Sequence, residues 1–443
     1  MASSRERCVL FAPPGAALAG RPVFGLQLVE RTVLAFLRAG VRDFAIAGDP
    51  EVAAQVAAIL AAGRCREARV RLLAPHESLV PWLEGDPARF VVRTDTLYDR
   101  RLIARFVEET RRAPAAVVAV DFRADALAAQ DGAPRTASWR PPAGEDAGAR
   151  LRAAGRGLMA PAGVLAGLAR VGPSFGRALE DAPPACRSIE NALTLLARRE
   201  PVDTWAVAGL WQAVRPAPGP EEVDLATARR KVLAGAVGVA DGVIARYLNR
   251  PLSRRITERL LSRDVKPWQI SVASFFGVLF AGLAFAMGHA TTGGLLAQFS
   301  AVLDGVDGEI ARIRYQDSPF GGVYDALLDR VADAALIGGM TFYAWLMGAG
   351  HSAVALGFAA VAGSSLSMLA KEKYAAQYRR PYASEREGVW RWLLLGRDGR
   401  LFLTLVAGVT GHVEAVLAYL AVGTHLHAGA RLVRMRSEGV RAG

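Results

Sequence analysis

The sequence DGVDGEIAR, residues 304–312, is followed after eight residues by GGVYDALLD, residues 321–329. The first segment carries two aspartates three residues apart, and the second carries two aspartates four residues apart. Each pair therefore shares one face of a helix. Both segments lie in apolar stretches joined by a short polar loop, which predicts an antiparallel helical hairpin. Such a hairpin sets the four carboxylates at matched depths, facing one another.

Four acidic side chains in apolar helices need a partner for their charge. A carboxylate at the centre of a membrane helix costs about 3 kcal/mol, so four of them require compensation. Asp304, Asp307, Asp325 and Asp329 offer oxygen ligands, with no Cys or His nearby. Mg²⁺ or Mn²⁺ prefers such a donor set, so a divalent-metal site is predicted. A buried polar network or proton relay in a transporter is the alternative.

The residues around the aspartates suit a phosphate ligand. Gly308 and Gly321 carry no side chain, so a ligand can approach the backbone closely. Ala311 leaves room one turn beyond the aspartates, and Arg312 can bind a phosphate through two parallel hydrogen bonds.

Composition changes along the chain. The 443 residues are 52% hydrophobic and carry a net charge of +12, and long apolar stretches begin near residue 268. Basic residues flank these stretches, which favours an anionic membrane surface over nucleic acid as the partner. By the positive-inside rule, both termini lie in the cytoplasm. Six membrane-spanning helices are expected at about 268–289, 293–313, 321–347, 353–374, 397–411 and 412–433.

The first half alternates strand-like and helix-like segments. This order predicts an α/β domain, residues 1–232, with a doubly wound parallel sheet. Residues 246–263 are expected to form a basic amphipathic helix at the membrane surface, and an ordinary linker helix is the alternative. Residues 264–443 are expected to form the membrane domain. The expected strands are 8–12, 44–47, 90–94 and 115–120, and the expected helices are 26–39, 50–62 and 101–112.

The two aspartate motifs resemble the full signature of the CDP-alcohol phosphotransferase family. The resemblance implies transfer of a phospho-alcohol from CDP to an acceptor hydroxyl, two bound Mg²⁺ (or Mn²⁺) ions and a homodimer in the cell (inner) membrane. Asp329 would contact the second metal and act as the general base. The other three aspartates would ligate metal, and the CDP group would be held by Asp304, Asp307, Gly308, Ala311, Arg312, Gly321 and Asp325.

Flanking segments add to the resemblance. Residues 249–251 and 253–256 are similar to the interfacial helix of this family, and Trp268 is a departure from it. A basic cluster at the end of the fourth expected span could bind a phosphate on the acceptor, or could anchor the helix at the bilayer. The cluster consists of Lys371, Lys373, Arg379 and Arg380. No role follows from the sequence for Arg397 and Asp398.

The order of the two halves resembles the bifunctional inositol-1-phosphate cytidylyltransferases joined to a di-myo-inositol phosphate phosphate synthase. In that resemblance Asp95 would bind a metal, and Trp211 would precede a second metal carboxylate. Ala213 or Arg215 occupies that second position instead, and prolines interrupt the expected phosphate loop at residues 12–18. A degenerate nucleotidyltransferase is therefore expected, and a bifunctional enzyme that makes its own CDP-alcohol is the alternative.

The substrates stay open at this point. A polyol phosphate such as inositol phosphate is the expected acceptor for a CDP-alcohol donor. The alternatives are a phospholipid synthase that uses CDP-diacylglycerol and a non-catalytic transporter or scaffold with the same fold.

Overall fold

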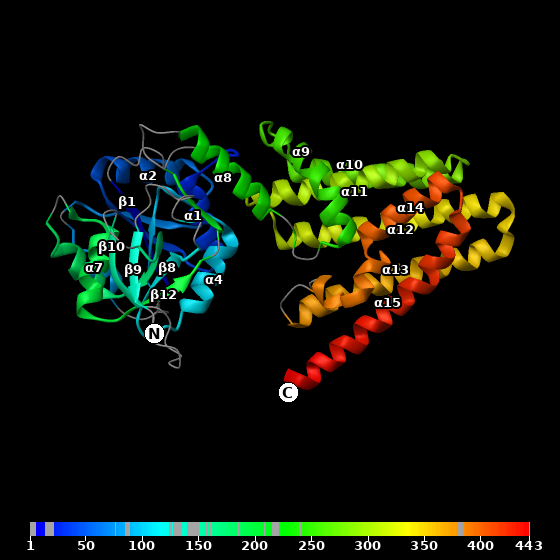
Figure 1. Cartoon of the computed structure of the whole chain (residues 1–443). Coiled ribbons are helices and arrows are strands. Elements are labelled where there is room, and N and C mark those ends of the chain that lie inside the picture. The colour runs from blue at the N-terminus through cyan, green and yellow to red at the C-terminus, as the bar shows by residue number, and fades with distance from the viewer. Residues whose placement is uncertain are drawn as a thin grey trace. The chain divides into compact units, whose positions relative to one another are not determined.

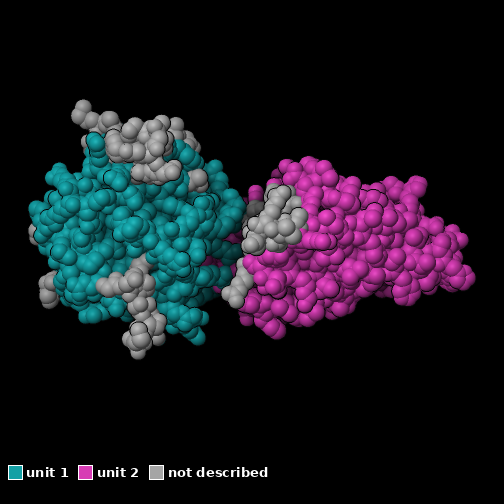
Figure 2. All heavy atoms as spheres, turned by 90° about the horizontal axis from the view of Figure 1, so that it is seen from below, with its two compact units in different colours: residues 1–235 teal, residues 236–443 magenta. Residues whose placement is uncertain are grey.

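A computed structural model describes the chain except for residues 1–5, 14–21, 76, 85–88, 124–125, 127–134, 140–149, 156–157, 159–160, 184–185, 208, 215–220, 237, 239–240, 379–381, 383 and 443. The chain divides into two compact units, Met1–Gly235 and Ala236–Gly443 (Figures 1 and 2). The first unit contains strands and helices, whereas the described part of the second unit is helical.

A nine-stranded sheet forms the centre of the first unit (Figure 1), in the order β5-β4-β1-β6-β11-β8-β12-β10-β9. Its strands are β1 (Arg7–Ala12), β4 (Asp43–Gly48), β5 (Arg69–Leu72), β6 (Arg89–Arg93), β8 (Ala116–Asp121), β9 (Arg135–Trp139), β10 (Arg150–Gly155), β11 (Gly163–Val171) and β12 (Val202–Ala206). The short pairs are β2 (Pro22–Val23) with β3 (Leu26–Gln27) and β7 (Thr96–Tyr98) with β13 (Trp211–Ala213).

The prediction of a wholly parallel sheet is wrong, because β10 and β11 run antiparallel to their neighbours, although β12 pairs in parallel with β8. β1, β4, β5 and β6 pair in parallel, but β11 lies antiparallel between β6 and β8. β11 is an almost continuous apolar run, GVLAGLARV, and it is buried along nearly its whole length. A run of this kind marks a strand covered on both faces but does not give its direction.

Helices cover both faces of the sheet. Alternate residues of β1 point to opposite faces. Val9 and Phe11 join a core with α3 (Val80–Leu83), α6 (Pro173–Glu180) and α7 (Ile189–Arg199). On the other face, rings of α1 (Leu28–Arg38) and α4 (Arg100–Thr110) pack against Phe44 and Phe90. The remaining helices of this unit are α2 (Pro50–Ala62) and α8 (Glu221–Gly235). The α/β prediction is thus confirmed.

The second unit is built from long helices. They are α9 (Arg250–Leu261), α10 (Pro267–Ala286), α11 (Ala290–Ile313), α12 (Pro319–Ala344), α13 (Gly350–Tyr378), α14 (Arg397–Thr410) and α15 (Val413–Ala442), with shorter helical segments η3 (Ala245–Asn249), η4 (Trp345–Ala349) and η5 (Ser384–Leu393). Gly348 and Gly350 adopt positive φ angles of 102° and 58°. The chain reverses at these glycines, so α13 packs back against α12 (Figure 1).

Two helical stretches, Pro267–Ala286 and Pro319–Tyr378, are long and apolar enough to cross a membrane. The second stretch contains both α12 and α13. α11 is 24 residues long, but its charged residues lower its apolarity. Large apolar side chains nevertheless face outward from the helices of this unit, for example Phe280 at 57% exposure and Phe358 at 77%. The six expected spans remain a prediction.

Glycines allow the long helices to pack at backbone contact. A Cβ on Gly339 of α12 would lie 2.0 Å from the carbonyl oxygen of Gly282 in α10. A Cβ on Gly408 of α14 would lie 2.3 Å from the carbonyl oxygen of Ala290 in α11. Small residues at such crossings are typical of helices packed inside membranes. The two contacts fix α12 against α10 and α14 against α11.

α9 lies against α11 through polar side chains. Its buried face carries Arg250, Ser253 and Thr257, whereas Leu252 of α9 and Leu248 of η3 are exposed. Arg314, just beyond α11, donates to the carbonyl oxygens of Val265 and Arg263, each at 2.6 Å, and to that of Leu261 at 3.3 Å. The end of α9 is therefore attached to the end of α11.

Candidate active site

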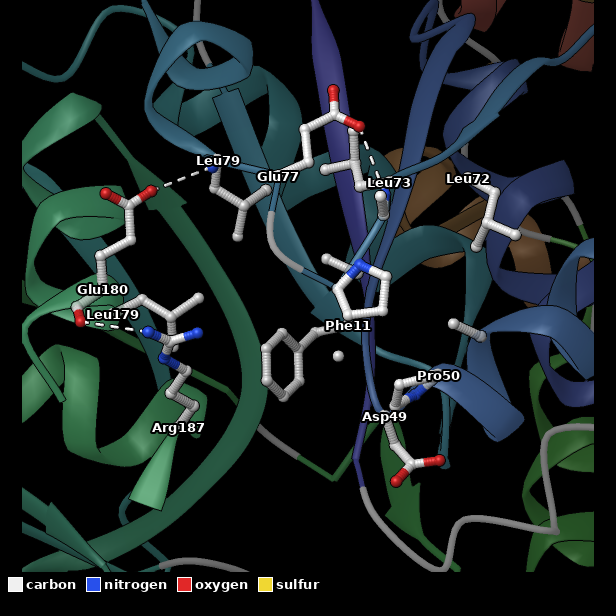
Figure 3. A pocket seen from close by; sticks show the side chains of 15 residues that line it. Phe11, Asp49, Pro50, Leu72, Leu73, Glu77, Leu79, Leu179, Glu180 and Arg187 are labelled. Atoms are coloured by element: carbon white, nitrogen blue, oxygen red, sulfur yellow. Dashed lines mark hydrogen bonds between the residues drawn. The ribbon is translucent and has the colours of Figure 1, made fainter. Parts of the chain in front are cut away.

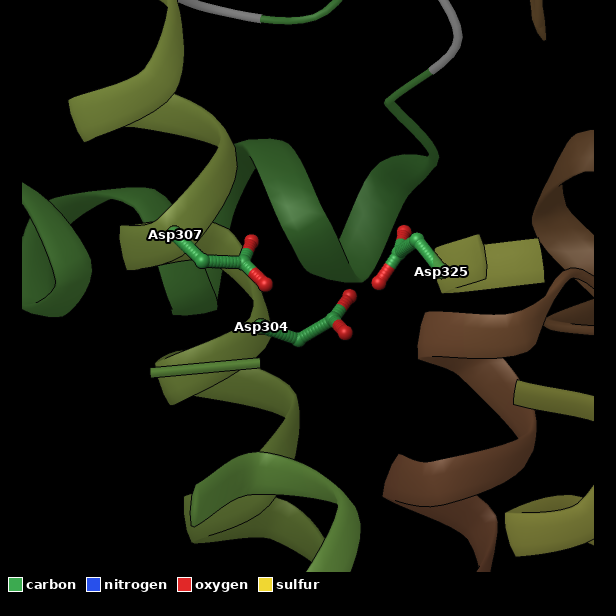
Figure 4. Close-up of side chains that lie close together, drawn as sticks. All are labelled: Asp304, Asp307 and Asp325. Carbon is green, nitrogen blue, oxygen red and sulfur yellow. The ribbon is translucent and has the colours of Figure 1, made fainter. Parts of the chain in front are cut away.

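Three of the four predicted aspartates come together. Asp304 and Asp307 extend from α11 and Asp325 extends from α12, and their carboxylates point toward one another (Figure 4). One oxygen from each lies within 4.8 Å of the others. Three oxygens at this separation can surround one hard cation. We call this group the aspartate cluster.

Asp329 lies outside this group of three and is joined to it by an arginine. Nη2 of Arg397, the first residue of α14, lies 2.7 Å from Oδ1 of Asp329. Nη1 of the same guanidinium donates to Oδ2 of Asp304 at 2.8 Å. Arg397 therefore bridges α11 and α12, which agrees with the prediction that the four carboxylates lie at matched depths.

A second hydrogen bond fixes the cluster from α10, because Ser271 Oγ donates to Oδ2 of Asp307. Nearby, the Arg312 guanidinium lies over Gly308, where a Cβ would be 2.9 Å from Nη1. Arg312 Nε donates to the carbonyl oxygen of Ala236 at 2.5 Å.

The other two residues predicted to hold CDP are placed by their helices. Gly321 lies in the first turn of α12 and donates its N–H to Ser318 Oγ at 3.0 Å. Ala311 is half-buried near the end of α11.

A small basic pocket opens beside Arg397. Its volume is about 130 Å³, and both acidic and basic side chains line it. Five basic residues outnumber the two acidic residues, Glu387 and Asp398. The basic residues are Lys371, Arg391, Arg397, Arg400 and Arg431. An excess of positive charge around a small cavity suits a compact anion such as phosphate.

Glu387 organises the basic side chains of this pocket. Its Oε1 accepts from Arg431 Nε at 3.2 Å and lies 3.3 Å from Lys371 Nζ. His427 Nε2 lies 3.5 Å from the other oxygen. Burial raises the pKa of Glu387, but His427, Lys371 and Arg431 lower it by more, so the pKa lies below the usual range. The carboxylate therefore stays charged and holds the cations in place.

The residues predicted to bind the acceptor phosphate lie in different surroundings. Lys371 lines the basic pocket, whereas Lys373 is exposed. Arg379 and Arg380 lie outside the described residues. No role was predicted for Arg397, and no sequence pattern singled out Arg400, Arg431 or Glu387. Arg400 and Arg431 stand in apolar helices, so the burial argument used for the aspartates was a signal that could have found them.

In the first unit, the predicted metal ligand Asp95 is paired with an arginine. Arg93 Nε and Nη2 donate to its two oxygens at 2.9 and 2.6 Å, and Arg93 Nη1 donates to Glu190 at 2.5 Å. Ala213 lies opposite Thr96, next to Asp95, so no carboxylate faces Asp95 from this strand. Arg215 and residues 14–18 lie outside the described part of the chain.

The first unit also contains a larger pocket, of about 590 Å³, at the ends of β1, β4 and β5 (Figure 3). Apolar side chains such as Phe11 line it together with three carboxylates. Glu77 accepts from Arg71, Glu180 accepts from Ser78, and Asp49 caps α2. These carboxylates are therefore engaged within the protein.

Comparison with known proteins supports the resemblance drawn from the aspartate motifs. Residues 265–428 match the family model described as CDP-alcohol phosphatidyltransferase. The chain is 32% identical over 242 residues to the bifunctional IPC transferase and DIPP synthase of Aquifex aeolicus (strain VF5), covering 52% of each chain. It is 36% identical over 211 residues to the protein of the same name from Rubrobacter xylanophilus, covering 45% of this chain and 47% of that relative.

The chain thus spans about half the length of the curated relatives it matches. Among solved structures, the inositol-1-phosphate CTP transferase from T. maritima aligns with a TM-score of 0.38 at 14% identity. That alignment covers 51% of this chain and 96% of that structure.

Proposed function

We propose that this chain transfers a phospho-alcohol group from a CDP-alcohol to the hydroxyl of an acceptor and releases CMP. The observation that carries the proposal is the convergence of Asp304, Asp307 and Asp325 from two helices. These residues lie inside the segment that matches the CDP-alcohol phosphatidyltransferase family.

The aspartate cluster fits divalent cations, because each carboxylate offers a hard oxygen donor and these oxygens lie within 4.8 Å of one another. Asp304, Asp307 and Asp325 would hold one cation, and Asp329 would contribute to a second. Bound Mg²⁺ or Mn²⁺ would neutralise the pyrophosphate and stabilise charge on the attacking and leaving oxygens.

The protein's own residues perform the remaining steps. Asp329 accepts the proton of the acceptor hydroxyl. The hydroxyl oxygen then bonds to the phosphorus that carries the alcohol. The bond from this phosphorus to the bridging oxygen breaks, and CMP leaves with the electron pair. The backbone at Gly308 and Gly321 and the Arg312 guanidinium hold the cytidine diphosphate, with Ala311 leaving room for it.

The acceptor is a polyol phosphate, such as an inositol phosphate, whose phosphate occupies the basic pocket. Lys371 and Arg431 line this pocket, and Arg397 connects it to Asp329. A hydroxyl of an acceptor bound there would lie near the proposed base. The relatives named above are DIPP synthases, which favours a soluble acceptor. The second candidate function is a phospholipid synthase that uses CDP-diacylglycerol as the donor.

The second unit is embedded in a membrane, with α9 at its surface. Outward-facing apolar side chains on α10, α12 and α13 support this placement, as do the two apolar helical stretches. Exposed Leu252 of α9 and Leu248 of the preceding η3 lie beside basic residues, and this arrangement suits an anionic leaflet. A homodimer, with the first unit and the C-terminus in the cytoplasm, completes the proposal.

The first unit does not transfer nucleotides. Both oxygens of Asp95 are bound by Arg93, and Ala213 or Arg215 occupies the position expected of a second metal carboxylate. The full chain should therefore release no pyrophosphate from CTP, Mg²⁺ and inositol 1-phosphate above an Asp95→Asn background. Pyrophosphate release by the wild type alone would establish the bifunctional alternative.

The test of the main activity is CMP release by the purified chain against a panel of CDP-alcohols and acceptors, with and without Mg²⁺. Asp329→Asn should lower kcat by at least about a hundredfold while CDP-alcohol binding persists. Asp264→Asn, at an exposed position before α10, is the control and should keep full activity. A protein that binds the substrates but never forms CMP would instead be the transporter or scaffold.

A further inference from the structure

Arg397 occupies a position between two charged sites. One side of its guanidinium donates to Asp304 and lies 2.7 Å from Asp329. The same residue lines the basic pocket together with Lys371, Arg400 and Arg431. Its side chain is only 13% exposed, so its charge is balanced mainly by carboxylates rather than by water. These are Asp304 and Asp329, with Asp333 at 3.7 Å from Nε. The aspartate cluster and the basic pocket therefore share one cation.

The position of Arg397 in its helix is unfavourable on local grounds. It is the first residue of α14, after the N-cap Gly396. The amino end of a helix carries a partial positive charge and disfavours a cation there. Asp398 in the same turn suits the helix end. Ion pairs with α11 and α12 therefore hold Arg397 in place, although the positive end of its own helix disfavours a cation there.

The contacts make Arg397 a competitor of divalent cations. A carboxylate oxygen that accepts from a guanidinium has less negative charge to offer to a metal. An anion in the basic pocket attracts the same guanidinium and weakens its hold on Asp304 and Asp329. Conversely, cations bound at the aspartates repel Arg397 toward the pocket.

We propose that Arg397 couples the two sites, so that divalent-cation binding at the aspartate cluster and phosphate binding in the basic pocket strengthen each other. The inference rests on the proposed function, because it takes the cluster as a metal site and the pocket as an anion site. Linkage requires the effect to be reciprocal, and coupling between sites is commonly about fivefold or more in affinity. The acceptor would then bind well only to a metal-loaded site.

The test is Mn²⁺ binding by the full chain in detergent, followed through the electron paramagnetic resonance signal of free Mn²⁺. Titrations run without an anion, with inorganic phosphate and with glycerol as a neutral polyol, each beside a protein-free blank. For the wild type, phosphate should lower the Mn²⁺ Kd by about fivefold or more, and glycerol should leave it unchanged. Arg397→Gln should bind Mn²⁺ more tightly than the wild type without phosphate, and phosphate should no longer change its Kd.

Arg255→Gln is the control, because Arg255 is exposed on α9 and lines neither site, so it should leave the coupling in place. Arg397→Lys tests the idea with the charge retained, and its coupling should be smaller than that of the wild type. Arg397 variants with the wild-type Mn²⁺ Kd and phosphate dependence would overturn the inference alone. A wild type that binds no Mn²⁺ would overturn the proposed function as well.

Discussion

Arg250 of α9 donates from Nη1 to Oε1 of Glu309 in α11 at 2.8 Å, and Glu309 is only 1% exposed. Ser253 and Thr257 donate to the same carboxylate at 2.8 and 2.6 Å. Arg250 also donates to Asp241 at 2.7 Å and to the carbonyl oxygen of Gly305 at 3.0 Å. Glu309 therefore fixes α9 beside the helix that carries two of the clustered aspartates.

Arg250→Met should destabilise the protein, because it leaves the buried carboxylate of Glu309 without a cation. Removal of one partner from a buried ion pair costs about 3–5 kcal/mol. The measurement is thermal unfolding of the purified chain in detergent. Arg255→Met, on the exposed side of the same helix, is the control and should unfold at the wild-type temperature. Equal melting of the two variants would show that the buried pair contributes little.

Gly339→Ala should disturb the crossing of α10 and α12. The new Cβ would meet the Gly282 carbonyl at 2.0 Å, so the helices must separate, and overpacking of this kind costs about 1–3 kcal/mol. Because α12 carries Asp325 and Asp329, CMP release should fall together with stability. Gly338→Ala is matched in chemistry, and its Cβ would meet nothing within 4 Å. It should behave as the wild type, and a comparable loss there would contradict the packing argument.

Lys371→Met should weaken use of a phosphorylated acceptor. Lys371 lines the basic pocket, and loss of one charged contact to a phosphate costs about 1.5–3 kcal/mol, or roughly tenfold or more in kcat/KM for the acceptor. KM for the CDP-alcohol should stay the same. Lys373→Met removes an exposed lysine of the same helix and serves as the control. An equal effect of both variants would favour the anchoring role for this cluster.

The ion pairs of Glu387 should make the stability of the protein depend on pH. Burial raises the pKa of Glu387, but His427, Lys371 and Arg431 lower it by more, so the pKa falls on folding. Its stabilising contribution is therefore complete above the pKa of an unfolded glutamate, about 4.3, and is lost as the pH falls through the lower folded value. Glu387→Gln should melt at a lower temperature than the wild type at pH 7. The difference should shrink below about pH 4, and a difference that grows with acid would contradict the assignment.

Patterns that act over a few residues were predictive here. The apolar and helical segments of β1, β4, β6, α1, α2 and α4 were found within a few residues of their bounds. The convergence of Asp304, Asp307 and Asp325 followed from helical spacing and a short connection. Resemblance to a known family added the chemistry that spacing alone does not specify.

Features that depend on contacts between distant segments could not be predicted from the sequence. β11 pairs directly with β6 although four strands, β7 to β10, lie between them along the chain, and nothing in the residues of β11 gives its direction. Arg397 meets Asp304 through the packing of α14 against α11, in which Gly408 lies at backbone contact with Ala290. Arg93 neutralises Asp95 through a side-chain orientation that no spacing rule supplies. Six spans remain an inference from apolar length and loop charge.

Arg314 donates hydrogen bonds to three carbonyl oxygens at the end of α9. Together with Glu309 they attach α9 to α11 at two points a turn or more apart, so the two helices form one stiff body. A tilt of the outer helix would shift Asp304 and Asp307 along with it. A surface that contacts α9 would therefore influence the position of the clustered carboxylates.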